Sequence, residues 1–167
     1  MRLAESLIAE LDREAKSTER ILDRVPQDKL EWQPHPKSMS LGQLAWHIAT
    51  LPASVMRGLA EGKREVSGSR PSAREGSDFV GTFRKSLSDL KAVLSATPDE
   101  VLLKERFAFV RNGEPVVSFP KLGLIRTVLM NHSIHHRGQL TVYLRLLDVP
   151  VPAMYGTSAD ENAFERR

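Results

Sequence analysis

The chain has 167 residues, of which 41% are hydrophobic and 27% are charged, a composition typical of a folded globular domain and not of a disordered protein. It contains no cysteine, which excludes a disulfide framework, a thiolate metal site and a cysteine nucleophile. Its 24 Lys and Arg residues are balanced by 21 Asp and Glu residues along the chain, so the formal net charge of +3 indicates a solvated surface and no nucleic-acid partner.

The N-terminal segment "MRLAESLIAELDREA" alternates charged and apolar side chains and lacks the apolar centre of a secretory signal. No stretch approaches the roughly 18 apolar residues that a membrane span requires. We therefore expect a cytoplasmic protein with no membrane partner. A chain of this length can bury a core unaided, so we expect a single domain over residues 1–167.

Apolar residues at steps of three and four predict an amphipathic helix over residues 2–24. Pro26 ends this helix. Pro34 and Pro36 have fixed φ angles and no N–H, so they make the following segment an extended connector.

A second helix is expected to begin at Leu41. Ser40 and Gln43, three residues apart, form the sequence signature of a capping box. The apolar stripe of this helix continues at helical spacing to Leu59.

Residues 61–77 are rich in Gly, Ser and charge and are expected to form a mobile loop. Large apolar residues then repeat at helical spacing from 78 to 96, which predicts a third helix. Thr97 and Glu100 make a second capping signature, so a short helical turn is expected to follow.

The dipeptide Asn112-Gly113 lies between two apolar runs and predicts a β-hairpin. The last long helix is expected over residues 120–147. Four long amphipathic segments with one short hairpin predict an all-α fold, a four-helix bundle with a small β-hairpin excursion before the last helix.

The last predicted helix contains three of the five histidines of the chain. A helix advances by about 100° per residue, so His132 and His136 lie on one face, and it is the apolar face. His135 lies about 60° to the other side, at the edge of the apolar stripe. Histidines in an apolar segment need a compensating interaction. This can be a metal ion, a hydrogen-bond network or exposure to solvent on a helix face.

Two imidazoles are too few for a tight metal site, so a third ligand must come from another element. The candidates are His35, in the proline-rich connector, and His47, at the border of the apolar stripe of the second helix. We favour His47 because a helical position is better fixed than a loop position, and we expect His35 at the surface. His47, His132 and His136 would then leave coordination positions open, which is typical of a catalytic site.

Other polar residues of the last helix have less defined roles. His135 and Tyr143 are weak catalytic candidates, although a tyrosine at this position is more often a core residue. Gln139 is either a hydrogen-bond partner of a ligand or a core residue satisfied by backbone groups. Arg137 points about 140° away from His132 and is expected to be solvated or paired on the outside.

Three separated stretches, "SMSLGQLAWHIA", "NHSIHHRGQLTVYLRLL" and "VPVPAMYGTSADE", resemble the DinB-like (DinB/YfiT-like) metalloenzyme superfamily over nearly the whole chain. The resemblance implies a four-helix bundle with a divalent metal held by three histidines, often in a homodimer. The family histidines match His47, His132 and His136. Better understood relatives are S-transferases that use bacillithiol or mycothiol, and a mycothiol-dependent isomerase.

The first hypothesis is therefore a metal-dependent transferase that joins a low-molecular-weight thiol to an electrophilic substrate. Imidazole sites suit several metals, with zinc or nickel favoured over manganese or iron. One alternative is a metal-dependent hydrolase in which His135 or a carboxylate accepts the proton. A second alternative is a non-catalytic metal-binding stress protein whose metal clamps two helices.

Overall fold

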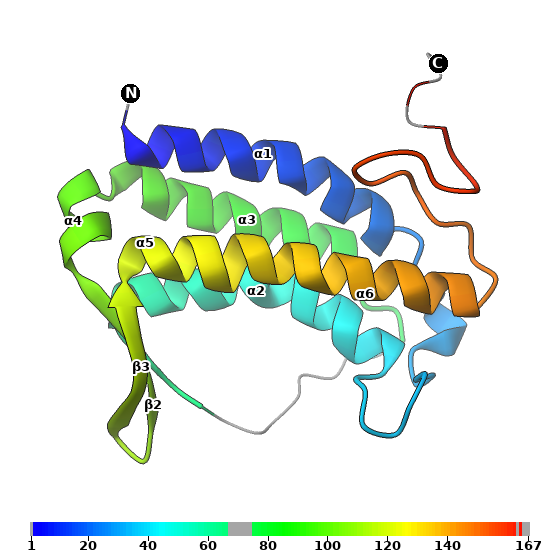
Figure 1. Cartoon of the computed structure of the whole chain (residues 1–167), viewed down its shortest axis with the longest axis horizontal. Coiled ribbons are helices and arrows are strands. Elements are labelled where there is room, and N and C mark those ends of the chain that lie inside the picture. The colour runs from blue at the N-terminus through cyan, green and yellow to red at the C-terminus, as the bar shows by residue number, and fades with distance from the viewer. Residues whose placement is uncertain (1, 67–74, 163, 165–167) are drawn as a thin grey trace.

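The computed structural model describes residues 2–66, 75–162 and 164 (Figure 1). The chain is mostly helical and carries a small three-stranded sheet. Three long helices come first along the chain: α1 (Leu3–Leu22), α2 (Leu41–Glu61) and α3 (Phe79–Ala96). The last long helical segment is composite and consists of α5 (Lys121–Gly123), the π-helical η2 (Leu124–Asn131) and α6 (His132–Leu146).

The long helical segments lie alongside one another (Figure 1). α2 packs against both α3 and α6, and α1 packs against α3 and α6. Their apolar stripes form one core to which each of them contributes buried leucines, among them Leu11, Leu44, Leu90 and Leu140. In the part of the chain that the structure describes, no helix is both long and apolar enough to cross a membrane.

The start of α2 confirms the predicted capping box. The Ser40 hydroxyl accepts a hydrogen bond from the Gln43 backbone N–H at 3.3 Å, and the Gln43 side-chain oxygen accepts one from the Ser40 N–H at 3.0 Å. These reciprocal bonds satisfy backbone donors at the helix start. They fix the first turn of the helix that carries His47.

The prediction that Thr97 caps the next helix is wrong. The Thr97 hydroxyl instead donates to the Val93 carbonyl at 2.8 Å, and the short helix α4 (Asp99–Lys104) begins after Pro98 without a side-chain cap. The Asp99 carboxylate accepts from the Leu3 N–H of α1 at 3.0 Å. The short helix is present as predicted, but the Thr97 hydroxyl bonds back into α3 and the carboxylate at the start of α4 serves the first turn of α1.

The hairpin predicted at Asn112-Gly113 is confirmed, but it is part of a larger sheet. β2 (Arg106–Arg111) pairs antiparallel with β3 (Glu114–Pro120), and both turn residues have positive φ, 53° and 84°. β1 (Lys63–Glu65) adds to β2 in parallel. The prediction of a loop over residues 61–77 is therefore wrong at residues 63–65, and its positions 67–74 lie outside the described residues.

The predicted bundle with a two-stranded excursion is thus too simple, although the mostly helical class is correct. The exposed residues of β1 show no apolar alternation, and their pairing depends on a strand about 40 residues later in the chain. The predicted helix over 120–147 is also not regular, because η2 interrupts it. His132 nevertheless begins a regular α-helix, so the spacing argued for the histidines applies.

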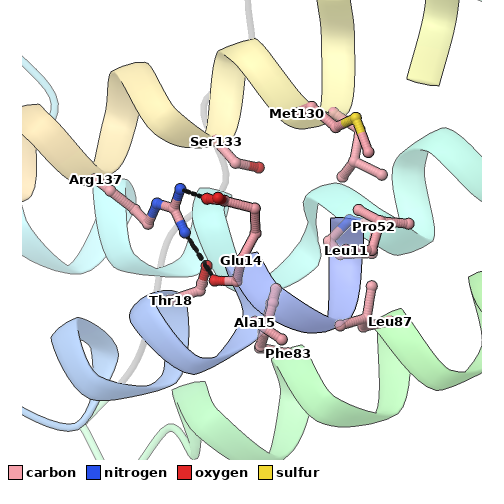
Figure 2. A pocket seen from close by; sticks show the side chains of 11 residues that line it. Leu11, Glu14, Ala15, Thr18, Pro52, Phe83, Leu87, Met130, Ser133 and Arg137 are labelled. Carbon is pink, nitrogen blue, oxygen red and sulfur yellow. Dashed lines mark hydrogen bonds and ion pairs between the residues drawn. The ribbon is translucent and has the colours of Figure 1, made fainter. Parts of the chain in front are cut away.

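The prediction that Arg137 is solvated or paired on the outside is wrong. The residue is 1% exposed, and its guanidinium pairs with the Glu14 carboxylate of α1. It also donates to the Glu14 carbonyl at 2.8 Å and to the Thr18 hydroxyl at 2.9 Å (Figure 2). The reason is that α6 contacts α2 on one side and α1 on another, so the face opposite the histidines is covered too.

A cavity of about 20 Å³ lies next to Arg137, lined by residues of α1, α2, α3, η2 and α6 (Figure 2). Substrate pockets generally enclose about 300 Å³ or more, so this cavity is a packing gap within the core and not a substrate site.

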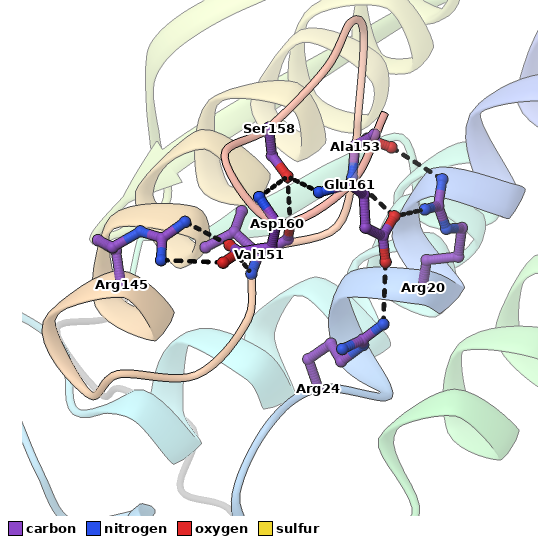
Figure 3. A network of polar contacts seen from close by, with 8 residues as sticks. All are labelled: Arg20, Arg24, Arg145, Val151, Ala153, Ser158, Asp160 and Glu161. Carbon is purple, nitrogen blue, oxygen red and sulfur yellow. Dashed lines mark hydrogen bonds and ion pairs between the residues drawn. The ribbon is translucent and has the colours of Figure 1, made fainter. Parts of the chain in front are cut away.

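The segment after α6 is held by side-chain carboxylates that face α1 and α6 (Figure 3). Glu161 pairs with Arg20 and Arg24 of α1, and Asp160 pairs with Arg145 of α6. The same carboxylates accept backbone N–H groups of the segment itself, at Ala153 and Val151. Within its described residues, the C-terminal segment therefore binds to two helices without forming a helix or strand.

We predict that Glu14→Gln lowers the free energy of unfolding by about 2 kcal/mol, because it leaves the buried Arg137 charge without its counter-charge. Urea denaturation of the metal-free protein would measure this change. Glu19→Gln on the same helix is the matched control, because Glu19 pairs with the exposed Arg84, and it should leave the stability nearly unchanged. Equal effects of the two substitutions would contradict the structural role of the Arg137 pair.

Candidate metal site

Three imidazoles meet between α2 and α6. The Nε2 atom of His132 lies 3.0 Å from Nε2 of His47 and 2.9 Å from Nε2 of His136. The ligand atoms of all three residues lie within 4.8 Å of one another, so the predicted convergence is present in the structure. That these residues bind a metal stays a prediction.

Local structure explains how each ring reaches this point. His132 and His136 are four residues apart in the first turns of α6, so both leave the same face. His47 is on α2, which packs against α6, and its ring stands nearly perpendicular to both others, at 83° and 88°. The contact between the two helices therefore builds the site.

Hydrogen bonding between the rings cannot satisfy this arrangement. Nδ1 of His136 lies 2.7 Å from the Gln139 side-chain oxygen, an acceptor, so it donates there and leaves a lone pair on Nε2. His132 Nε2 carries one proton at most when the ring is neutral, so it cannot bond both neighbouring Nε2 atoms. A cation at the centre would satisfy all three lone pairs.

The donor set fits a divalent transition metal. Imidazole nitrogens bind zinc at about 2.0–2.1 Å, which places two ligand nitrogens of one ion roughly 3.0–3.4 Å apart, depending on the coordination angle. The observed separations of 2.9 and 3.0 Å are close to the lower end of that range.

Gln139 determines which nitrogen of His136 faces the cluster. Its side-chain oxygen holds the Nδ1 proton, one turn along α6, and so fixes both the tautomer and the ring orientation. This contact decides between the two roles that the sequence left open for Gln139. It is a hydrogen-bond partner of a candidate ligand.

The electrostatics of the site keep the imidazoles neutral. Burial, followed by positive charge on His136, His132 and Arg64, lowers the pKa of His47 to about 4. Burial, followed by positive charge on His136, His135 and Arg64, also lowers the pKa of His132 to about 4. For His136, burial lowers the pKa and the hydrogen bond to Gln139 opposes that shift. Near neutral pH the lone pairs are therefore available to a metal without competition from protons.

The remaining candidates lie outside the cluster. His135 is exposed, and its ring centre is 5.0 Å from that of His136. Tyr143 is buried, donates to the Met39 carbonyl at 3.2 Å and packs edge-on against Trp32. His35 is exposed and accepts a backbone N–H in its own connector, as expected of a surface residue.

The sequence reasoning missed Arg64. It lay within the predicted loop, but the structure places it on β1 with its charge close enough to affect His47 and His132. No local pattern identifies it, because its position depends on the pairing of β1 with β2.

We compared the chain with known proteins. The model of the DinB family matches residues 1–167. The chain is 22% identical over 148 residues to the uncharacterized protein YrdA of Bacillus subtilis (strain 168), covering 89% of this chain and 85% of that protein. A crystal structure of a DinB-like protein from Bacillus cereus is similar with a TM-score of 0.71 and 26% identity, covering 90% of this chain and 97% of the other.

A second solved structure, of the DinB-like protein YjoA from Bacillus subtilis, has a TM-score of 0.63 at 18% identity. It covers 86% of this chain and 92% of that chain. At this identity the likeness concerns the fold alone.

We predict that Gln139→Leu lowers the metal affinity by about 10-fold to 100-fold, because His136 loses the acceptor that fixes its tautomer. Competition with a chromogenic chelator would measure the affinity. Gln139→Glu keeps an acceptor at this position and should retain most of the affinity. If the leucine variant bound metal as tightly as the wild type, the assigned role of Gln139 would be wrong.

We also predict that the metal-free protein loses stability as the pH falls from about 6.5 towards 4. The folded-state pKa of His47 and His132 is about 4 against 6.5 for an unperturbed histidine, so in this window the unfolded state binds more protons. Protons therefore favour unfolding there, and the full stability is present above the window. Denaturant titrations at several pH values would measure the slope.

In the pH experiment, His132→Asn should flatten the slope, whereas His35→Asn should leave it unchanged because His35 is exposed. A slope that is identical in the wild type and in the His132 variant would disprove the assignment.

Proposed function

This chain belongs to the DinB family, and on that premise we propose that His47, His132 and His136 hold a divalent metal at the centre of an active site. We propose that the site transfers a low-molecular-weight thiol to an electrophilic substrate. The observation that supports this most is the convergence of three imidazole Nε2 atoms whose contacts cannot all be satisfied by hydrogen bonds between the neutral rings.

The ligand count favours a site that accepts substrate. Within the described part of the chain, no carboxylate and no fourth imidazole joins the cluster of three. A structural zinc site generally has four protein ligands, whereas three protein ligands leave a position for a reacting group. His47 and His132 are only half-buried, so this position can be reached from solvent.

A thiol substrate would supply the sulfur nucleophile that the chain itself lacks. The sequence has no cysteine to act as a nucleophile. A divalent metal bound to the three imidazoles would supply a Lewis acid that keeps a thiol sulfur deprotonated near neutral pH.

The residues around the cluster have separate tasks in this proposal. Gln139 keeps the Nε2 lone pair of His136 directed at the centre, through the hydrogen bond to Nδ1. The low pKa of His47 and His132 keeps both rings unprotonated. His135, exposed beside the cluster, is placed to take up the proton that the thiol releases and to pass it to solvent.

The proposal extends to the metal and the partners. Zinc or nickel is favoured because imidazole donors suit both, with manganese or iron as alternatives. The thiol would be of the bacillithiol or mycothiol kind used by better understood DinB-like enzymes. A homodimer would cover the exposed apolar side chains Ile134, Val142 and Leu146, which lie at helical spacing along α6.

We predict that the protein, stripped of metal and reloaded with zinc, nickel, manganese or iron, conjugates a thiol to 1-chloro-2,4-dinitrobenzene. The rate of thioether formation above the uncatalysed rate is the measurement. His132→Asn should abolish both metal binding and turnover, because two imidazoles are too few for a tight site. His35→Asn is the matched control, since His35 is exposed in its connector, and it should be fully active.

The same assay distinguishes the alternatives. Hydrolysis of an ester or amide without added thiol would identify a hydrolase. A large loss of stability on chelation, without turnover of any substrate, would identify a structural metal in a non-catalytic protein. Either result would refute the transferase proposal.

A further inference from the structure

Arg64 is an exposed cation that two contacts fix in place. Its guanidinium donates a hydrogen bond to the Ser54 hydroxyl of α2. The guanidinium carbon also lies 5.9 Å from the ring centre of Phe109, which is the residue paired with Arg64 across the β1–β2 register. An aromatic face and a hydroxyl therefore hold the side chain, which restricts the freedom of an otherwise flexible arginine.

These contacts place the cation on the face of α2 that carries His47, about 10 Å from it along the helix axis. Ser54 follows His47 by seven residues, about two turns, so both side chains leave the same face of α2. The charge of Arg64 acts on the two half-buried imidazoles of the cluster, His47 and His132. The guanidinium is thus close to the accessible side of the site.

Among the described residues, no carboxylate contributes to the shifted pKa values of the three imidazoles. The charged groups that act on the three imidazoles are the imidazoles themselves, His135 and Arg64. Among residues 2–66, 75–162 and 164, no carboxylate forms an ion pair with Arg64, whereas Arg84, Arg126 and Arg145 each have one. A divalent metal would add two further positive charges.

From this arrangement we infer that Arg64 binds an anionic group of the substrate, so that the site selects a thiol that carries a carboxylate over a neutral thiol. The inference rests on the proposed function, because it assumes a ligand whose sulfur occupies the metal centre. Ser54 takes one N–H of the guanidinium, and the other N–H groups remain able to form a forked pair with a carboxylate.

The experiment uses the full-length protein loaded with cobalt(II), whose visible absorption changes when a ligand binds. The thiol probes are 3-mercaptopropionate and 2-mercaptoethanol, which differ in charge. Succinate and propionate form a second pair of probes without sulfur. Each can bind the metal through one carboxylate, but only succinate has a second carboxylate that could reach Arg64. Dissociation constants are measured for the wild type, Arg64→Met, Arg64→Lys and the control Arg57→Met.

The expected result is that Arg64→Met weakens binding of 3-mercaptopropionate and of succinate by about 10-fold, the effect of losing a charge-assisted hydrogen bond at an exposed site. Binding of 2-mercaptoethanol and propionate should not change, which shows that the metal site is intact. Arg64→Lys should be intermediate, because it keeps the charge without the fork. Arg57 is an exposed arginine of α2 whose charge does not act on the imidazoles, so its variant should resemble the wild type.

The two proposals can fail separately. If no thiol binds but succinate affinity depends on residue 64, the transferase proposal fails and the anion-binding role of Arg64 is supported. If thiols bind but the Arg64 and Arg57 variants behave alike, thiol chemistry stands and the role of Arg64 is overturned. Failure of both charged probes to bind the wild type would also overturn it.

Discussion

Three neutral imidazoles whose Nε2 atoms meet cannot all bond to one another, because each Nε2 carries either one proton or one lone pair. The contact between α2 and α6 imposes this condition on His47, His132 and His136, and the hydrogen bond from His136 to Gln139 fixes the tautomer of His136. Burial makes protonation of the rings energetically unfavourable, as the lowered pKa values of His47 and His132 indicate. A metal cation is a partner that would be compatible with all of these constraints.

The orientation of α6 about its own axis is therefore central to the site, and a contact on its opposite face secures it. Arg137 extends from α6 to α1, where it meets the Glu14 carboxylate and two oxygen acceptors (Figure 2). A rotation that moved His132 and His136 out of the cluster would also break this buried ion pair. The same helix is fastened near its end by the pair between Arg145 and Asp160.

The sequence predicts the features whose cause is local. Helical stripes, the capping box at Ser40, the turn at Asn112-Gly113 and the shared face of His132 and His136 depend on residues close together in the chain. The features that sequence reasoning got wrong depend on distant partners. Residues 63–65 form a strand because they pair with β2. Thr97 is the exception, because its hydroxyl bonds to the Val93 carbonyl one turn earlier in α3. Arg137 is buried because both sides of α6 are covered, which a single helical wheel cannot reveal.

The π-helical stretch η2 has a consequence for the evolution of this chain. A π-helical turn holds one more residue than an α-helical turn, and such a turn arises when a single residue is inserted into an α-helix. Each residue added or lost before His132 rotates the following helix by about 100° relative to the preceding one. The number of residues between Leu124 and Asn131 should therefore be inherited more strictly than their identities, and a one-residue gap in an alignment at this point would separate homologues that keep the histidine cluster from those that do not.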